Sequence, residues 1–138
     1  MNLNEETQKK YLELQLLDQQ IKQLQQQLMT VNQQIVELRR VDDDLSEFEK
    51  VKENSNMFFA LGPGIFAEGS ISSKDLLLNV GSNVLVKKPV IDTKKLINVQ
   101  VAELEGLMVR LQEDMGAIGL RGNELQEELT ELNTKKDK

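Results

Sequence analysis

Residues 61–88, LGPGIFAEGSISSKDLLLNVGSNVLVKK, are unlike the sequence on either side of them. This stretch holds four of the eight glycines, together with apolar runs of strand length. Both flanks are rich in Gln, Glu and Leu at the spacing of helices. The pattern therefore predicts a small patch of β-sheet inserted between two long helices.

The insert predicts two β-hairpins. The first would pair MFFAL (57–61) with GIFAEGSI (64–71) around the chain breaker Gly62-Pro63-Gly64. The second would pair DLLLNV (75–80) with NVLVKK (83–88) around Gly81-Ser82. Several of the apolar runs are continuous rather than alternating, which is typical of strands covered on both faces.

A single chain of this kind cannot supply that cover. Isolated hairpins are marginal in water and leave exposed edges. We therefore expect the hairpins to be an assembly surface, where strands from other subunits complete a β-barrel. The residues expected at this oligomerisation surface are Phe58, Phe59, Leu61, Ile65, Phe66, Ile71, Leu76, Leu78, Val80, Val84 and Val86.

Each flank predicts a coiled-coil helix, over residues 1–54 and 92–136, the second capped by Asp92 or Thr93. The apolar residues recur at alternating spacings of three and four. The N-terminal seam is Leu14, Leu17, Ile21, Leu24, Leu28, Val31, Ile35 and Leu38. The C-terminal seam is Ile97, Val101, Leu104, Met108, Leu111, Met115, Ile118, Gly122, Leu125, Leu129 and Leu132.

Two such helices can fold back as an antiparallel pair. The expected fold class is α+β, a long antiparallel two-helix coiled coil with two central β-hairpins that join an oligomeric β-barrel platform, in a single domain over residues 1–138. If residue 54 faces residue 93, Leu14 lies opposite Asn133 and Leu38 opposite Val109. Three glycines in the second helix would permit a close helix–helix approach or form a soft segment, and both interpretations stand. They are Gly116, Gly119 and Gly122.

Composition argues against most catalytic chemistry. The chain has no histidine and no cysteine, so it lacks the commonest general base, the commonest metal ligand and any thiolate. We expect no enzymatic activity, no metal and no cofactor. A net charge of −6 with scattered Lys and Arg argues against a nucleic-acid partner. We also expect no membrane contact and a cytoplasmic location, because no segment has the length and apolarity of a membrane span or a signal peptide.

The order of helix, two hairpins and helix resembles the alpha class of prefoldin subunits. The resemblance in sequence lies in LGPGIFAEGSI of the first hairpin and LLLNVGSNVLVKK of the second. Asn83 and Val84 stand where that family tends to carry glycine and an aromatic residue, and Lys87 where an acidic residue is common. Asn tolerates a left-handed turn conformation, so the hairpin is expected to form.

The resemblance implies a hexameric co-chaperone of two alpha-class and four beta-class subunits. Their hairpins would build a double β-barrel platform from which coiled-coil arms extend. The arm tips would hold unfolded polypeptides without ATP and deliver them to a group II chaperonin. The partners implied are a second copy of this chain, the beta-class subunits, unfolded client proteins and the chaperonin.

Both chain ends would meet at an arm tip, where leucines beside the seam are expected to contact clients. The residues expected there are Leu3, Tyr11, Leu12, Leu14, Leu16, Leu125, Leu129 and Leu132. The alternative is that these side chains only cap the coiled coil. The protein would then be a structural tether or adaptor that docks one folded partner in a multiprotein complex.

Overall fold

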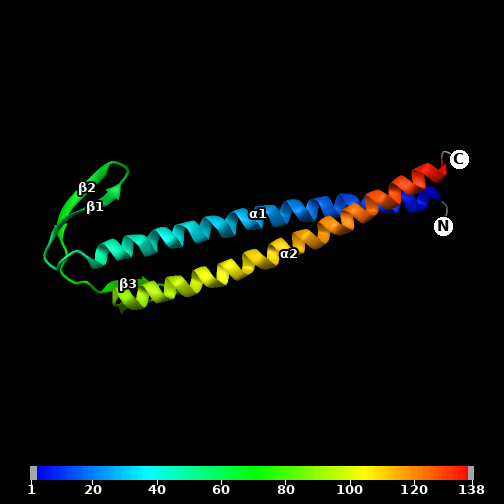
Figure 1. The fold of residues 1–138 in the computed structure, drawn as a ribbon. Coiled ribbons are helices and arrows are strands. Elements are labelled where there is room, and N and C mark those ends of the chain that lie inside the picture. The colour runs from blue at the N-terminus through cyan, green and yellow to red at the C-terminus, as the bar shows by residue number, and fades with distance from the viewer. Residues whose placement is uncertain (1–2, 137–138) are drawn as a thin grey trace. The chain divides into compact units, whose positions relative to one another are not determined.

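The structure is a computed structural model that describes residues 3–136 (Figure 1). The elements are α1 (Leu3–Glu49), β1 (Asn56–Gly62), β2 (Ile65–Ser70), β3 (Leu76–Asn79), β4 (Leu85–Lys88) and α2 (Val90–Lys136). The predicted fold class, two long helices on either side of two hairpins, is confirmed. The chain forms two compact units. We call them the terminal unit (residues up to Gln34 and from Leu104 onward) and the hairpin unit (Ile35–Glu103).

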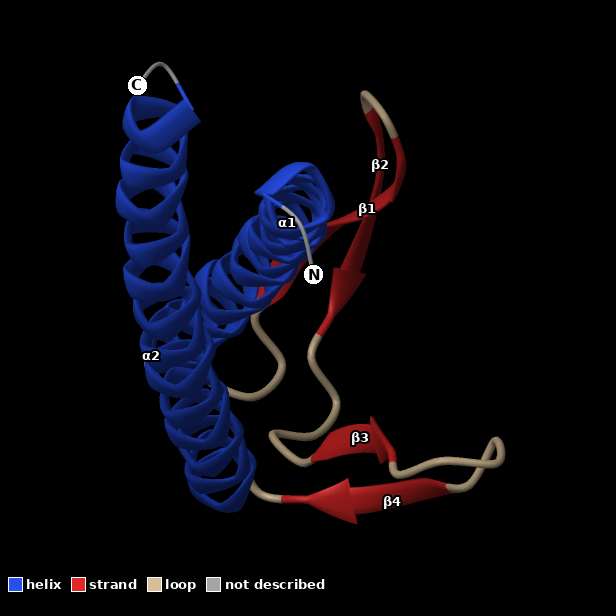
Figure 2. Ribbon diagram, turned by 90° about the vertical axis from the view of Figure 1, so that its right-hand side faces the viewer, coloured by secondary structure: helices blue, strands red, loops and turns tan. Residues whose placement is uncertain are grey.

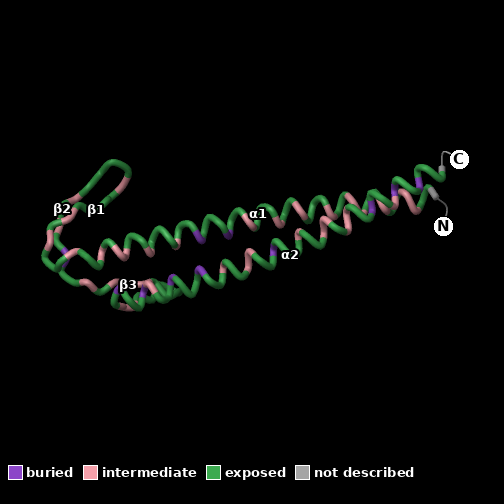
Figure 3. Tube along the Cα trace, viewed as in Figure 1, coloured by how far each residue is buried: buried purple, intermediate pink, exposed green. Residues whose placement is uncertain are grey.

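The heptad seams form the core of the helices. Every predicted seam position is buried or half-buried, whereas most other helical positions are exposed (Figure 3). In the terminal unit Val31, Leu111 and Leu125 are buried, and in the hairpin unit Ile35 and Val101 are. Full burial of such side chains stabilises each site by about 1.5–3 kcal/mol. The apolar periodicity therefore sets which face of each helix is inside.

The register of the helix pair differs from the predicted one. In the terminal unit Lys10 lies against Glu128, instead of Leu14 against Asn133, and in the hairpin unit Lys94 reaches Ser46. This is a shift of roughly one heptad. The cause is that α1 ends at Glu49 rather than at residue 54, and α2 begins at Val90 rather than at residue 92.

The end of α1 is fixed by a lysine from a distant part of the chain. The amino group of Lys74, between the two hairpins, donates hydrogen bonds to the backbone carbonyls of Phe48 and Val51. The same amino group lies 4.3 Å from the centroid of the Phe48 ring. The last turn of α1 has no basic residue of its own. Lys74 thus places a cation at the carbonyl end of the helix dipole and satisfies carbonyls that the helix leaves open.

Pro89, rather than Asp92 or Thr93, precedes the first turn of α2. The backbone N–H of Thr93 donates to the Pro89 carbonyl at 3.1 Å, and the Thr93 hydroxyl donates to the same oxygen. Asp92 therefore lies inside the first turn, where its carboxylate interacts favourably with the positive end of the helix dipole.

The hairpins are two separate two-stranded antiparallel sheets, β1–β2 and β3–β4 (Figure 2). In the first, Gly62 pairs with Ile65 across a Pro63-Gly64 turn, and Gly64 has a φ of +73°. Proline followed by a residue of positive φ is the pattern of a type II turn. In the second, Ser82 and Asn83 have φ values of +51° and +61°, as the two central residues of a type I′ turn do. The expected left-handed conformation of Asn83 is confirmed.

The three glycines of α2 do not mark a close helix approach. The helix runs unbroken through them, and a methyl group added at Gly116, Gly119 or Gly122 would meet no atom within 4 Å. Of the two interpretations, close packing at this face is therefore wrong.

Replacing all three of these glycines by alanine should stabilise the chain. Each substitution removes backbone entropy from the unfolded state and has space in the folded one, so each should add about 0.5–1 kcal/mol to the free energy of unfolding. Urea unfolding followed by far-ultraviolet circular dichroism measures this. Gly64→Ala is the control. It should lower the free energy of unfolding, because the positive φ at this position strains any side chain. An unchanged or lower urea midpoint for the triple variant would contradict the prediction.

Lys74→Met should destabilise the hairpin unit by about 1–2 kcal/mol, because Met retains the apolar stem but cannot donate to the α1 carbonyls. The measurement is the urea midpoint of the full chain. Lys52→Met is the matched control, because Lys52 is an exposed lysine of the segment that follows α1. Equal midpoints for the two variants would show that the Lys74 amino group does not hold the helix end.

Candidate functional site

The outer surfaces of the hairpins are apolar and open. Phe58 and Leu61 of β1 are 71% and 73% exposed. The pairing register places Phe58 and Phe66 on the same face of the first sheet, since their partners are Glu68 and Ala60. Ile65, beside the turn, is also exposed. Monomeric proteins rarely expose apolar side chains of this size together, so this face is a candidate surface for binding another protein.

The opposite face of the first hairpin is more closed. Phe59 lies across Gly69, where an added Cβ would be 3.1 Å from the Phe59 ring, so glycine leaves the space that the ring fills. Ile71 differs from the prediction. It is buried, and its backbone pairs with Asn54 and Ser55, so its side chain belongs to the interior of the hairpin unit rather than to an open surface.

The second hairpin also has one covered and one open face. Leu76, Leu78 and Val86 share a face that is half-buried. The other face carries Leu77 and Leu85, which are 62% and 59% exposed. The sequence analysis omitted these two residues. The signal was present in the continuous run of three leucines, because such a run gives both faces an apolar side chain.

Beyond those strands, Val80 and Val84 flank the type I′ turn and are exposed. They face each other across the loop, where the N–H of Val80 donates to the carbonyl of Val84 at 3.0 Å. The hairpin therefore ends in an apolar pair at its turn.

The chain-end half of the terminal unit contains the residues expected to contact clients. Tyr11, Leu12 and Leu16 are exposed on α1. Leu14 is half-buried on the seam. The side chain of Leu3 lies outside the part of the chain that the structure describes.

The α2 residues expected at the same surface are covered. Leu125 is fully buried, and Leu129 and Leu132 are buried beside it. The structure thus divides the predicted client-binding set into an exposed part on α1 and a part enclosed between the helices.

A network of charges lies beside these buried leucines and was not anticipated. The Arg121 guanidinium donates to both carboxylate oxygens of Glu13, at 2.9 and 3.3 Å, and to Glu124 at 3.2 Å. The Lys10 amino group donates to Glu128. Sequence reasoning missed the network because the predicted register placed Lys10 and Glu128 about two and a half turns apart, and Glu13 and Arg121 about three and a half turns apart.

These contacts shift the pKa values of Glu128 and Arg121. The hydrogen bond from Lys10 holds the pKa of Glu128 below its usual range, and the positive charge of Arg121 adds to the effect. The hydrogen bond to Glu13 raises the pKa of Arg121 above its usual value, with a further contribution from Glu124. Each charged form is therefore stabilised by the folded helix pair.

No cluster of potential metal ligands accompanies these surfaces in the described chain. Within residues 3–136, no three His, Cys, Asp or Glu side chains come together as ligands for a metal ion. Neither helix, over that same range, is long and apolar enough to cross a membrane.

Glu128→Gln should lower the stability of the helix pair near neutral pH and have less effect in acid. The folded-state pKa is below the ordinary value of 4.5, so the wild-type carboxylate contributes stability above that value and loses it as pH falls through the folded-state pKa. The urea midpoints of wild type and variant should therefore differ at about pH 7 and converge as the pH falls below the folded-state pKa of Glu128. Glu131→Gln, an exposed neighbour on α2, is the control. A constant difference across the pH range would contradict the assignment.

Comparison with known proteins gives one consistent result. The family model described as Prefoldin subunit matches residues 17–135. A prefoldin subunit alpha of Methanococcus maripaludis is 30% identical over 104 residues, which cover 75% of this chain and 70% of the relative. The prefoldin subunit alpha of Archaeoglobus fulgidus is 25% identical over 130 residues, which cover 94% and 95%.

A solved structure agrees with these relatives in fold. A chain of the filamentous PFD of Methanocaldococcus jannaschii, determined by cryo-electron microscopy, matches with a TM-score of 0.75 at 16% identity. The match covers 84% of this chain and 97% of that one. At this identity the likeness shows a shared fold.

Proposed function

Because the chain belongs to the prefoldin family, as an alpha-class subunit of the archaeal type, we propose that it is part of an ATP-independent holdase. In this proposal it binds unfolded polypeptides and delivers them to a group II chaperonin in the cytoplasm. It performs no chemical reaction and needs no cofactor. The observation that carries the proposal is the open apolar surface of two hairpins that have no further partner strands within residues 3–136.

The hairpins supply the assembly function. Their exposed side chains, among them Phe58, Phe66 and Leu77, would be covered by strands of neighbouring subunits in a β-barrel platform. Two hairpins in one chain offer strand edges to two neighbours. We propose that the neighbours are a second copy of this chain and four beta-class subunits, so that the complex is a hexamer.

The chain-end half of the terminal unit supplies the client contact. Tyr11, Leu12 and Leu16 give each arm a small exposed apolar surface. A single surface of this size binds weakly, but several arms on one platform engage one unfolded chain together, and multivalency raises the overall affinity. Slow release of the client then needs no tight individual contact.

The alternative, a structural tether, is favoured by one observation. Leu125, Leu129 and Leu132 are buried, and Arg121 pairs with Glu13 across the two helices of the same unit. A closed helix end is what an adaptor with one folded partner requires. A holdase would use the exposed α1 residues, so the two functions depend on different side chains.

Serine at all three of Tyr11, Leu12 and Leu16 should leave assembly intact and abolish most client holding. Native mass spectrometry of the complex pulled from its own cells measures assembly, and suppression of aggregation of a chemically denatured protein measures holding. The matched control is Met29→Ser with Val36→Ser, two exposed apolar residues further along α1. If the triple variant suppressed aggregation as well as the control, the client surface would not be at these residues. A stable one-to-one complex with a single folded protein would instead support the tether.

A further inference from the structure

One face of α1 carries a continuous stripe of neutral polar side chains. The stripe consists of Gln20, Gln23, Gln27, Thr30 and Gln34, spaced three and four residues apart, so that it runs along a single face of the helix beside the seam. Residues 23–36 include no charged residue, although 29% of the chain is charged. The stripe lies wholly within the terminal unit.

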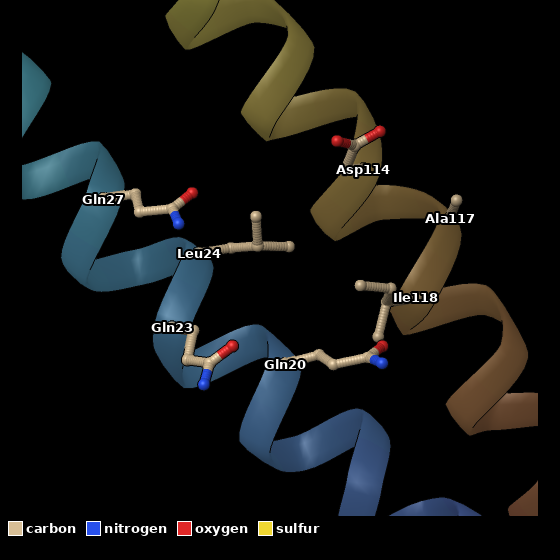
Figure 4. Close-up of a pocket in the computed structure, with 7 residues that line it drawn as sticks. All are labelled: Gln20, Gln23, Leu24, Gln27, Asp114, Ala117 and Ile118. Carbon is tan, nitrogen blue, oxygen red and sulfur yellow. The ribbon is translucent and has the colours of Figure 1, made fainter.

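Two adjoining hollows in the terminal unit follow this stripe. The first has a volume of about 370 Å³ and lies between Gln20, Gln23 and Gln27 on α1 and Asp114, Ala117 and Ile118 on α2. Figure 4 shows Leu24 and Ile118 pointing toward each other from the two helices, with the Gln20 amide beside Ile118.

The second hollow has a volume of about 630 Å³ and shares Gln23 and Gln27 with the first. Val31, Leu107 and Leu111 form its apolar side. Because the two hollows share lining residues, they form one groove with an amide wall on α1 and an apolar floor. We call it the glutamine groove.

The amides of this wall have no hydrogen-bond partner among residues 3–136. In the described residues, the side chains of Gln20, Gln23, Gln27 and Gln34 make no hydrogen bond to another residue. Positions that flank a coiled-coil seam usually carry Glu and Lys, which pair across the helices. The chain uses such pairs at Lys10 and Glu128. The glutamine groove therefore leaves its hydrogen-bonding groups available along the length where charge pairs would be expected.

We propose that the glutamine groove binds an extended, uncharged segment of an unfolded polypeptide. Each glutamine amide both donates and accepts, as each peptide group does, so the wall matches a backbone whatever its sequence. The apolar floor receives side chains that point toward it. The stripe is about 21 Å long, the length of roughly six extended residues.

The chemistry of the lining disfavours other ligands. No cation lines either hollow, so an anionic ligand finds no counter-charge. Asp114 is the single charged residue among the described lining residues, and it lies on α2 between Leu111 of the second hollow and Ala117 of the first. The inference rests on the proposed holdase function and extends it, because it places a second client contact between the helices and separate from Tyr11, Leu12 and Leu16.

The test uses glutamate, which keeps the shape of glutamine but replaces the donor with a negative charge. The pair Gln23→Glu and Gln27→Glu changes the groove, and the pair Gln25→Glu and Gln33→Glu is the control, with the same charge change on residues that line neither hollow. Each variant is the full chain with its co-purifying subunits. Circular dichroism confirms equal helicity.

The probe is a fluorescein-labelled peptide of Leu, Val, Asn and Ser that is too short to fold, and its affinity is measured by anisotropy. We expect binding about tenfold weaker for the groove pair and within about twofold of wild type for the control pair. A second probe, with Lys in place of two Asn residues, should regain affinity for the groove pair because it supplies the missing positive charge.

The outcomes separate the two proposals. Equal binding by the groove and control pairs, with wild-type binding intact, would overturn the glutamine groove and leave the holdase function standing. Absence of binding by wild type to both the peptide and a denatured protein would overturn both. A change in oligomeric state confined to the groove pair would mean that another copy of the chain occupies the groove, and would also overturn the proposal.

Discussion

The structure depends on where the chain can bury its apolar side chains and where it cannot. The helices bury theirs against each other, along a seam in which Val31, Leu111 and Leu125 are enclosed. The hairpins have no second layer of their own in the described chain, so Phe58, Leu61 and Leu77 stay in water. Exposed apolar area of this kind is typical of a surface that a partner covers. The proposed assembly surface therefore follows from the apolar strands of the insert, a different pattern from the heptads that form the helices.

Much of this could be predicted from the sequence, because periodicity reports which face is buried. Every position that the heptads predicted for the seam is buried or half-buried, and Gly62-Pro63-Gly64 and Gly81-Ser82 located both turns. The helix ends and the register could not be found in this way. The amino group that binds the carbonyl end of α1 belongs to Lys74, which is distant in sequence. The sequence around the helix end therefore does not predict this contact. The predicted register of the helix pair was therefore wrong by about one heptad, and the pairing of Arg121 with Glu13 was not predicted.

The candidate surfaces were predicted less completely, for a different reason. The sequence shows that a side chain is apolar, but the exposure of that side chain depends on which other residues pack over it. Ile71 and Leu77 have similar side chains in the same insert, yet Ile71 is buried and Leu77 is open. The backbone of Ile71 pairs with Asn54 and Ser55, whereas Leu77 lies on the open face of the second hairpin.

The polar contacts of the terminal unit divide its length into two kinds of surface. Near the chain ends, Arg121 and Glu13 form a two-point ion pair across the helices, and charged groups that meet in this way fix one arrangement. Along residues 23–36 no charge is present, and neutral amides neither attract nor repel a partner over long distances. A client that is held must later be released, and weak contacts spread along several arms permit both. Under the proposed holdase function a neutral wall would suit that task, because its amides can pair with any peptide backbone and carry no charge that would select among clients.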